Sequence, residues 1–181
     1  MRVIAGSYGG RRLHAPRGRA TRPTSERVRE ALFASLGELG GEVVLDLFAG
    51  TGALAIEALS RGAARAVLVE RDARALAALR ANLTALGIGE DTAEVRRGEA
   101  LRALRTARER SETYDLIFVD PPYSHAGVLG RELVAALPPL LAPRARVVVE
   151  SDRRSQPLEL GLQIELQRRY GDTVITIHRQ R

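Results

Sequence analysis

The sequence predicts an α/β fold built on a doubly wound, mostly parallel seven-stranded sheet, with a C-terminal antiparallel hairpin and an N-terminal β-hairpin plus helix extension. Two observations lead to this prediction. From residue 43 onward, short and nearly continuous apolar runs alternate with helical stretches, which is typical of a parallel sheet with helices on both faces. The last two apolar runs instead flank Gly171-Asp172, which is typical of an antiparallel turn.

Residues 1–40 are expected to form an extension ahead of the sheet. Two short extended segments flank Gly9-Gly10 and indicate a hairpin, because glycine accepts the positive φ of such turns. Thr24 or Ser25 can then cap a helix that ends at Gly37. The apolar face of this helix consists of Val28, Leu32, Phe33 and Leu36.

Residues 41–181 are expected to form one α/β domain. The predicted strands cover residues 43–47, 65–70, 92–97, 114–119, 146–150, 162–170 and 173–180. The predicted helices cover residues 51–62, 72–87, 99–110 and 125–138. In the second of these helices, leucines at positions 76, 79, 83 and 86 recur at helical spacing and predict a stripe that faces the core.

The positive charge of the chain is concentrated near its N-terminus. The formal net charge is +6, and residues 1–30 hold eight arginines but only two glutamates, so this segment carries the whole excess. A basic segment on a neutral body is typical of an arm that binds nucleic acid. Codon bias explains why all the basic residues are arginine, but it does not explain where they lie. The arginines expected to contact phosphates are Arg2, Arg11, Arg12, Arg17, Arg19, Arg22, Arg27 and Arg29. Of these, Arg22, Arg27 and Arg29 should lie at the start of the helix or on its exposed side.

The composition argues against several other classes of protein. Without cysteine, the chain has no disulfide framework and no thiolate zinc site. His14, His125 and His178 are far apart in the sequence, so we expect no metal cluster. No apolar run reaches the roughly 20 residues that span a bilayer, and the first residues are too polar for a signal peptide. We therefore expect a cytoplasmic protein without a bound metal ion, and a monomer by default.

A glycine-rich loop follows the first predicted strand. The sequence Gly50-x-Gly52-x-x-Ala55 lies between that strand and a helix, as in nucleotide-binding folds, where glycines let the backbone approach a ligand. Glu70 ends the second strand, where a carboxylate can accept hydrogen bonds from both ribose hydroxyls of an adenosine ligand. The alternative is a tight turn with packing glycines. The motif alone does not distinguish a dinucleotide from another adenosine ligand.

Two further carboxylates bear on the choice of ligand. Asp46 lies near the end of the first strand, four residues before Gly50, where its charge would repel a pyrophosphate but suits the ammonium and sulfonium groups of S-adenosylmethionine (SAM). Glu99 follows the third strand, where it can accept hydrogen bonds from an adenine amino group. As alternatives, Asp46 can order the loop and Glu99 can cap the helix that follows it.

The sequence Asp120-Pro121-Pro122-Tyr123 follows the fourth predicted strand. In a doubly wound sheet, strands one and four flank the point where strand order reverses, and ligands bind there at the carboxyl ends of the strands. The Asp120 carboxylate and the Pro121 carbonyl can each accept a hydrogen from an exocyclic amino group, and proline offers no competing N–H. Tyr123 can stack on the base that carries this amino group. The alternative is a stiff turn that only ends the strand.

Together these motifs resemble the class I SAM-dependent methyltransferases, which have a Rossmann-like fold, and more narrowly the bacterial RsmD family. The resemblance rests on RVIAGSYGGRRL, RPTSERVREALF, VLDLFAGTGALAIEALSRGA, VERD and DPPY. It implies methylation of guanine N2 in small-subunit (16S) ribosomal RNA, catalysis by the loop from Asp120 to Tyr123, and RNA contacts from the N-terminal hairpin and arginine-rich stretch. The SAM pocket that it implies consists of Asp46, Phe48, Ala49, Gly50, Thr51, Gly52, Glu70, Arg71, Glu99, Ala100 and Asp120.

Three other functions are compatible with these motifs. A DNA adenine-N6 or cytosine-N4 amino-methyltransferase would use the same Asp-Pro-Pro-Tyr chemistry, and only the N-terminal resemblance argues against it. A nicotinamide-dependent oxidoreductase would use the glycine-rich loop. A non-catalytic RNA-binding protein would keep the fold without its activity, although the intact loop and Asp120 argue against this function.

Overall fold

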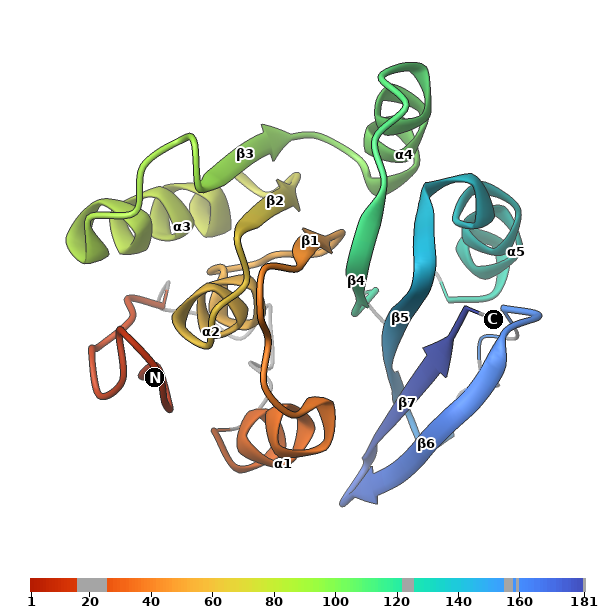
Figure 1. Cartoon of the computed structure of the whole chain (residues 1–181), viewed down its shortest axis with the longest axis horizontal. Helices are drawn as coiled ribbons and strands as arrows, with labels where there is room; N and C mark the ends of the chain where they lie inside the picture. The colour runs from red at the N-terminus through yellow and green to blue at the C-terminus, as the bar shows by residue number, and fades with distance from the viewer. Residues whose placement is uncertain (16–25, 122–125, 155–157, 159, 181) are drawn as a thin grey trace.

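Figure 1 shows the computed structural model, which describes residues 1–15, 26–121, 126–154, 158 and 160–180. Seven strands form one sheet in the order β3-β2-β1-β4-β5-β7-β6. They are β1 (Val43–Asp46), β2 (Arg65–Glu70), β3 (Ala93–Arg97), β4 (Tyr114–Val119), β5 (Leu141–Asp152), β6 (Gln163–Tyr170) and β7 (Thr173–Arg179). The first five strands pair in parallel. The predicted doubly wound arrangement is therefore confirmed, and the strand order reverses between β1 and β4.

The sheet ends in the antiparallel hairpin that the sequence predicts. β6 and β7 pair on either side of Gly171-Asp172, and β7 also pairs antiparallel with β5. Among the strands, only β5 differs from its predicted bounds by more than one residue. It begins at Leu141 instead of residue 146, and this added part is irregular, since Arg144 has a φ of 64° and the register with β4 shifts there.

Helices cover both faces of the sheet, as the sequence predicts. They are α1 (Glu26–Leu36), α2 (Ala53–Ser60), α3 (Ala73–Leu86), α4 (Ala100–Glu109), α5 (Ala126–Ala136) and the short 3₁₀ helix η2 (Pro138–Leu140). α1, α2 and α3 share one apolar cluster with the sheet, and α4 and α5 share a second cluster on its other face. In the part of the chain that the structure describes, no helix combines the length and the apolar character needed to cross a membrane.

The N-terminal segment, residues 1–15, forms a short hairpin around Gly9-Gly10, as the sequence predicts, with an antiparallel bridge between Arg2 and Arg12. The Val3 N–H donates to the Arg11 carbonyl and the Leu13 N–H to the Met1 carbonyl, each at 2.9 Å. Beyond this pairing, the segment contacts α2. The backbone N–H groups of Ile4 and Ala5 donate to the two carboxylate oxygens of the buried Glu57, at 2.7 and 3.1 Å. These N–H groups are therefore engaged by a helix instead of a partner strand, and the segment is held on α2.

α1 packs the N-terminal extension onto the sheet. Its predicted apolar face, Val28, Leu32, Phe33 and Leu36, is buried. The Phe33 ring lies against the Phe118 ring of β4, with the ring centroids 6.0 Å apart. Val3 and Leu13 of the N-terminal segment are buried in the same cluster. The described part of residues 1–40 therefore shares its hydrophobic core with the sheet.

Candidate active site

Four carboxylates stand at the carboxyl ends of four neighbouring strands. They are Glu70 of β2, Asp46 of β1, Asp120 directly after β4 and Glu150 of β5, named in the order in which the strands lie in the sheet. We refer to these four residues as the carboxylate row. Ligands of doubly wound sheets bind at this edge, beside the point where strand order reverses. The row therefore marks the candidate active site.

The strand register puts all four side chains of the row on one face of the sheet. Asp46 pairs with the residue two before Glu70 on β2 and with the residue two before Asp120 on β4. Side chains two residues apart on a strand point to the same face. The residue before Asp120 pairs with the residue before Glu150, so these two carboxylates lie side by side.

The row concentrates negative charge in a buried place, since Asp46 is 2% exposed and Glu150 is 8% exposed. Burial and the charge of Glu70 raise the pKa of Asp46 from 3.8 to about 7, although the Phe48 N–H donates to its carboxylate at 3.4 Å. Burial and the charges of Glu150 and Asp46 raise the pKa of Asp120 well above its usual value. A ligand with positive charge or N–H donors would reduce the repulsion between these carboxylates, whereas a pyrophosphate would add further negative charge.

The glycine-rich loop between β1 and α2 leaves open space at Gly50. This residue has a φ of 55°, and an added Cβ would meet no atom within 4 Å. Gly52 has a φ of 83°, but its Cβ would lie 2.4 Å from Cδ1 of the core residue Leu79. The missing Cβ of Gly52 therefore makes room for the core residue Leu79.

Glu70 holds the glycine-rich loop from the neighbouring strand. Its Oε2 accepts a hydrogen bond from the Gly50 N–H at 2.7 Å. Its Oε1 accepts from the N–H groups of Arg71 and Asp72, at 2.8 and 2.7 Å. The Gly50 N–H is thus directed at a carboxylate and not at an incoming anion. This arrangement argues against a phosphate site of the kind that dinucleotides use in such loops.

Arg71 and Glu99 face each other across the ends of β2 and β3. Arg71 Nη1 lies 3.3 Å from Glu99 Oε1, and both side chains are more than half exposed. Glu99 precedes α4, but its side chain accepts no hydrogen bond from the start of the helix, so the alternative that it caps α4 is wrong. Ala100, the first residue of α4, is buried. The structure thus brings together three residues that the resemblance assigns to the SAM pocket.

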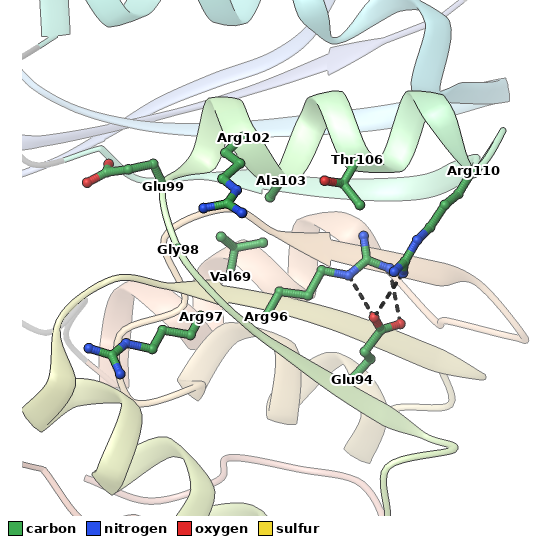
Figure 2. A pocket seen from close by; sticks show the side chains of 10 residues that line it. All are labelled: Val69, Glu94, Arg96, Arg97, Gly98, Glu99, Arg102, Ala103, Thr106 and Arg110. Carbon is green, nitrogen blue, oxygen red and sulfur yellow. Dashed lines mark hydrogen bonds and ion pairs between the residues drawn. The ribbon is translucent and has the colours of Figure 1, made fainter.

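A separate pocket of about 240 Å³ lies between the edge strand β3 and α4, as Figure 2 shows. Its charged lining consists of Arg96, Arg97, Arg102, Arg110, Glu94 and Glu99. Arg96 is held in it by the carboxylates of Glu94 and Glu112, at 2.8 and 2.7 Å. Val69, which also lines the pocket, belongs to the apolar cluster of α4 and α5, whereas the strand neighbours of Asp46 belong to the opposite cluster. The pocket therefore lies on the other face of the sheet from the carboxylate row.

The described residues include the first half of the predicted catalytic loop. Asp120 and Pro121 follow β4 directly and are partly buried. Pro122, Tyr123 and His125 lie outside the described residues. Within the ranges that the structure describes, no three His, Asp or Glu side chains are arranged so that they could hold a metal ion.

Comparisons with known proteins decide the family. Residues 1–179 match the family model described as "Conserved hypothetical protein 95", which is the RsmD family. The chain belongs to the RsmD family. It is 38% identical to "Putative rRNA methyltransferase YlbH" of Bacillus subtilis over the full length of both chains. It is 39% identical to "Ribosomal RNA small subunit methyltransferase D" of Escherichia coli K12, over 84% of this chain and 75% of that protein.

A solved structure supports the same conclusion. The structure titled "Putative methyltransferase yhhF from Escherichia coli" is 34% identical to this chain. It superposes with a TM-score of 0.83 and covers 99% of this chain and 97% of that one. The predicted resemblance to the RsmD family is therefore confirmed over nearly the whole chain.

The basic residues of this RsmD-family chain lie in different surroundings. Arg12 and Arg27 are exposed. The Arg2 guanidinium pairs with Glu26 at 3.3 Å, and the Arg11 guanidinium donates to the carbonyl of Ala85 at 2.9 Å. Three further arginines of the predicted RNA contact, Arg17, Arg19 and Arg22, lie outside the described residues.

Arg29 is buried, so the prediction that it lies on the exposed side of α1 is wrong. It is 0% exposed, and its guanidinium donates to the carbonyl of Arg2 at 2.6 Å. Burial lowers the pKa of Arg29, while the charges of Glu57 and Glu26 raise it. Arg29 stands four residues before Phe33, which puts both side chains on the same face of the helix. It anchors the N-terminal segment and does not present its charge to a phosphate.

Two residues of this region are absent from the sequence-based prediction. Glu150 ends the apolar run 146–150 as Glu70 ends the run 65–70, and this repeated pattern is a signal that identifies it. Asn82 lies on α3 and is 1% exposed. Its side-chain amide donates to the carbonyl of Thr51 in the glycine-rich loop at 3.0 Å. The sequence signal for Asn82 is its position next to Leu83 and three residues after Leu79, because this spacing puts a polar side chain on the stripe of leucines that faces the core.

Proposed function

We propose that this protein transfers a methyl group from SAM to the exocyclic N2 amino group of a guanine in small-subunit (16S) ribosomal RNA. The observation that carries the proposal is the position of Asp46 and Asp120 on one face of the sheet, at the ends of the adjacent strands β1 and β4. The names of the relatives from Bacillus subtilis and Escherichia coli support ribosomal RNA as the substrate. The choice of guanine N2 rests on the resemblance of the N-terminal sequence blocks to the RsmD family.

The residues around the glycine-rich loop fit SAM. Asp46 would bind the ammonium group of its methionine part, and Glu70 would accept hydrogen bonds from the ribose hydroxyls. The open space at Gly50 would admit the ligand close to the backbone. Phe48, Ala49, Thr51 and Gly52 would complete the loop side of the pocket, and Arg71, Glu99 and Ala100 its adenine side. When bound, SAM supplies a methyl group on a positively charged sulfur, which the lone pair of an amino nitrogen can displace.

Asp120 and Pro121 would prepare the guanine amino group for this displacement. An exocyclic amino nitrogen is a poor nucleophile, because its lone pair is delocalised into the ring. The Asp120 carboxylate and the Pro121 carbonyl would each accept one amino hydrogen, which directs the lone pair at the methyl carbon. As the nitrogen–carbon bond forms and the carbon–sulfur bond breaks, the nitrogen gains a positive charge. The Asp120 carboxylate would accept the excess proton, and its raised pKa favours this role.

The RNA would reach this site with its target base unstacked, as base-modifying enzymes require. Tyr123 would stack on the base. The exposed Arg12 and Arg27 would contact phosphates. The other arginines that we propose for this contact are Arg2, Arg11, Arg17, Arg19 and Arg22. Their charge would position the RNA backbone, whereas the crevice would select the atom that is methylated.

Incubation with methyl-labelled SAM and 16S rRNA tests the proposal. Free rRNA and small subunits that lack the modification should be compared as substrates, and the labelled nucleotide should be identified by mass spectrometry after digestion. We expect label on the N2 atom of a guanine with at least one of the two substrates. Label on adenine or cytosine, or no label in RNA from either substrate, would contradict the proposal.

A further inference from the structure

One buried side chain is bonded to both the N-terminal segment and the glycine-rich loop. Asn82 lies on α3 and is 1% exposed. Its Nδ2 donates to the carbonyl of Thr51 at 3.0 Å and to the carbonyl of His14 at 3.1 Å. Its Oδ1 accepts from the His14 N–H at 2.7 Å. Three of the four hydrogen bonds that an asparagine side chain can form are therefore made, to two segments distant in sequence.

Both bonded segments belong to binding regions under the proposed function. Thr51 lies between Gly50 and Gly52, at the centre of the loop that would hold SAM. His14 lies two residues after Arg12, an exposed arginine that we propose to contact RNA. Figure 1 shows the first residues beside α2, the helix that directly follows the glycine-rich loop. A change in the path of the chain at His14 therefore acts on a side chain that also holds the loop.

The burial of Asn82 makes its bonds interdependent. Its neighbours on the same stripe of α3, Leu79 and Leu83, are buried core residues, so water does not replace a lost partner of the amide. A buried amide group that loses its partner costs far more than an exposed one. If the chain at His14 moves away, the amide has to turn or shift to find a new partner, and its bond to Thr51 is strained or lost.

We propose that Asn82 is a positioning residue that couples RNA engagement by the N-terminal segment to the affinity of the glycine-rich loop for SAM. The proposal rests on the function proposed above and adds a thermodynamic link between its two substrates. RNA that holds the segment in place keeps Thr51 and the open space at Gly50 in the arrangement that accepts the cofactor. Because such coupling is reciprocal, SAM also strengthens the binding of RNA.

The coupling can be measured without turnover. S-adenosylhomocysteine (SAH), the demethylated product, serves as the probe, and its Kd is determined by calorimetry with and without saturating 16S rRNA. Couplings between sites are typically 5- to 150-fold, so we expect rRNA to tighten SAH binding about tenfold in the wild-type protein. Hydrogen exchange of residues 49–52 in the protein without SAH gives a second readout, and these amides should become better protected when rRNA is added.

A pair of substitutions at His14 isolates the backbone contact. His14→Pro removes the N–H that donates to Asn82 Oδ1, whereas His14→Ala keeps it and changes only an exposed side chain. We expect His14→Pro to weaken SAH binding several-fold and to abolish the effect of rRNA on the Kd for SAH. His14→Ala should behave like the wild type in both measurements.

Substitution of Asn82 itself completes the test. Asn82→Leu replaces the amide by an apolar side chain of similar size, and Thr84→Ala on the exposed face of α3 is its control. We expect Asn82→Leu to lose the effect of rRNA on SAH binding, and Thr84→Ala to retain it. An equal Kd for SAH with and without rRNA in the wild type would overturn the coupling. An undiminished effect of rRNA on the Kd for SAH in His14→Pro would also overturn it. Either result can be obtained while the protein still methylates 16S rRNA, so failure of the coupling is distinguishable from failure of the proposed function.

Discussion

Asp46 and Asp120 point to the same face of the sheet from the ends of two adjacent parallel strands, and the charge of Asp46 contributes to the raised pKa of Asp120. Buried acids in such a position keep their protons at pH values where exposed acids have lost them. Without a ligand, Asp46 and Asp120 therefore retain protons to higher pH than exposed aspartates do. A cationic ligand beside Asp46 would displace such a proton, since it stabilises the charged form of the acid.

The first prediction concerns the stability of the ligand-free protein as a function of pH. The pKa of Asp46 is raised from 3.8 to about 7, so between these values the folded chain holds a proton that the unfolded chain has released. The free energy of unfolding should therefore decrease as the pH rises from about 4 to about 7, by up to about 4 kcal/mol from this group. Chemical denaturation at several pH values measures this change.

The Asp46→Asn variant removes the contribution of Asp46, together with the part of the raised pKa of Asp120 that the charge of Asp46 causes. Glu94 and Glu112 have lowered pKa values because they pair with Arg96, so they change the stability in the opposite direction. Their contributions cancel when the wild type is compared with the variant. The loss of stability with rising pH should be smaller in Asp46→Asn, whereas the exposed Asp91→Asn should follow the wild type. Parallel curves for all three proteins would show that Asp46 is not protonated in the fold.

The second prediction concerns Asp120 in catalysis. In Asp120→Ala, the amino group of the base loses the carboxylate that would accept its hydrogen and its excess proton. We expect the rate of methyl transfer to fall by roughly 10²- to 10⁴-fold, which is typical for the loss of a general acid or base. The affinity for SAH should change little, because Asp46, Glu70 and the glycine-rich loop are intact. Single-turnover kinetics with labelled SAM and calorimetry with SAH measure the two quantities.

Asp91→Ala serves as the control for this variant, since it removes an exposed carboxylate far from the row in sequence. A variant that lost SAH binding and turnover together would assign Asp120 to cofactor binding. Full turnover in Asp120→Ala would remove the residue from the mechanism that we propose.

The sequence predicts those parts of the structure that local patterns determine. The strands and helices of residues 41–181 follow from continuous apolar runs and from the spacing of core leucines, and so does the position of Asp120 beside Asp46. The attachment of the N-terminal segment to α2 does not follow from local patterns, because it depends on hydrogen bonds to Glu57, which lies 52 residues or more along the chain. Arg29 is a different case. Its spacing from Phe33 indicates the buried face, while its charge argues for exposure.

The third prediction tests how the N-terminal segment is held on α2. Gly6 has a φ of 82°, and an added Cβ would lie 1.7 Å from the carbonyl oxygen of Ser60. Gly10 has a nearly equal φ of 79°, but its Cβ would meet nothing within 4 Å. Gly6→Ala therefore has to displace the segment from α2, where Ser60 accepts a hydrogen bond from the Ser7 N–H at 2.8 Å. Gly10→Ala is the matched control for the strain of a positive φ.

We expect Gly10→Ala to cost roughly 1–2 kcal/mol of stability, the usual cost of a left-handed conformation for a residue with a side chain. Gly6→Ala should cost at least about 2 kcal/mol more, because a hydrogen bond and the packing of the segment are also lost. Urea denaturation of the two variants gives the comparison. Equal stabilities would mean that the close contact between Gly6 and Ser60 does not exist in solution.

The last prediction concerns the exposed arginines of the N-terminal extension. Arg12 and Arg27 lie on this extension, whereas the exposed Arg131 lies on α5, away from the N-terminal segment in Figure 1. Each phosphate contact with single-stranded RNA contributes about −0.7 to the slope of log K against log salt concentration. The double variant Arg12→Ala/Arg27→Ala should therefore bind 16S rRNA more weakly, with a slope shallower by roughly 1.4, and Arg131→Ala should keep the wild-type slope. Filter binding at several salt concentrations measures these slopes. The same slope in all three proteins would mean that RNA binds to another side of the molecule. Removal of an arginine that contacts a phosphate reduces the number of counterions released on binding, and so it must change the slope.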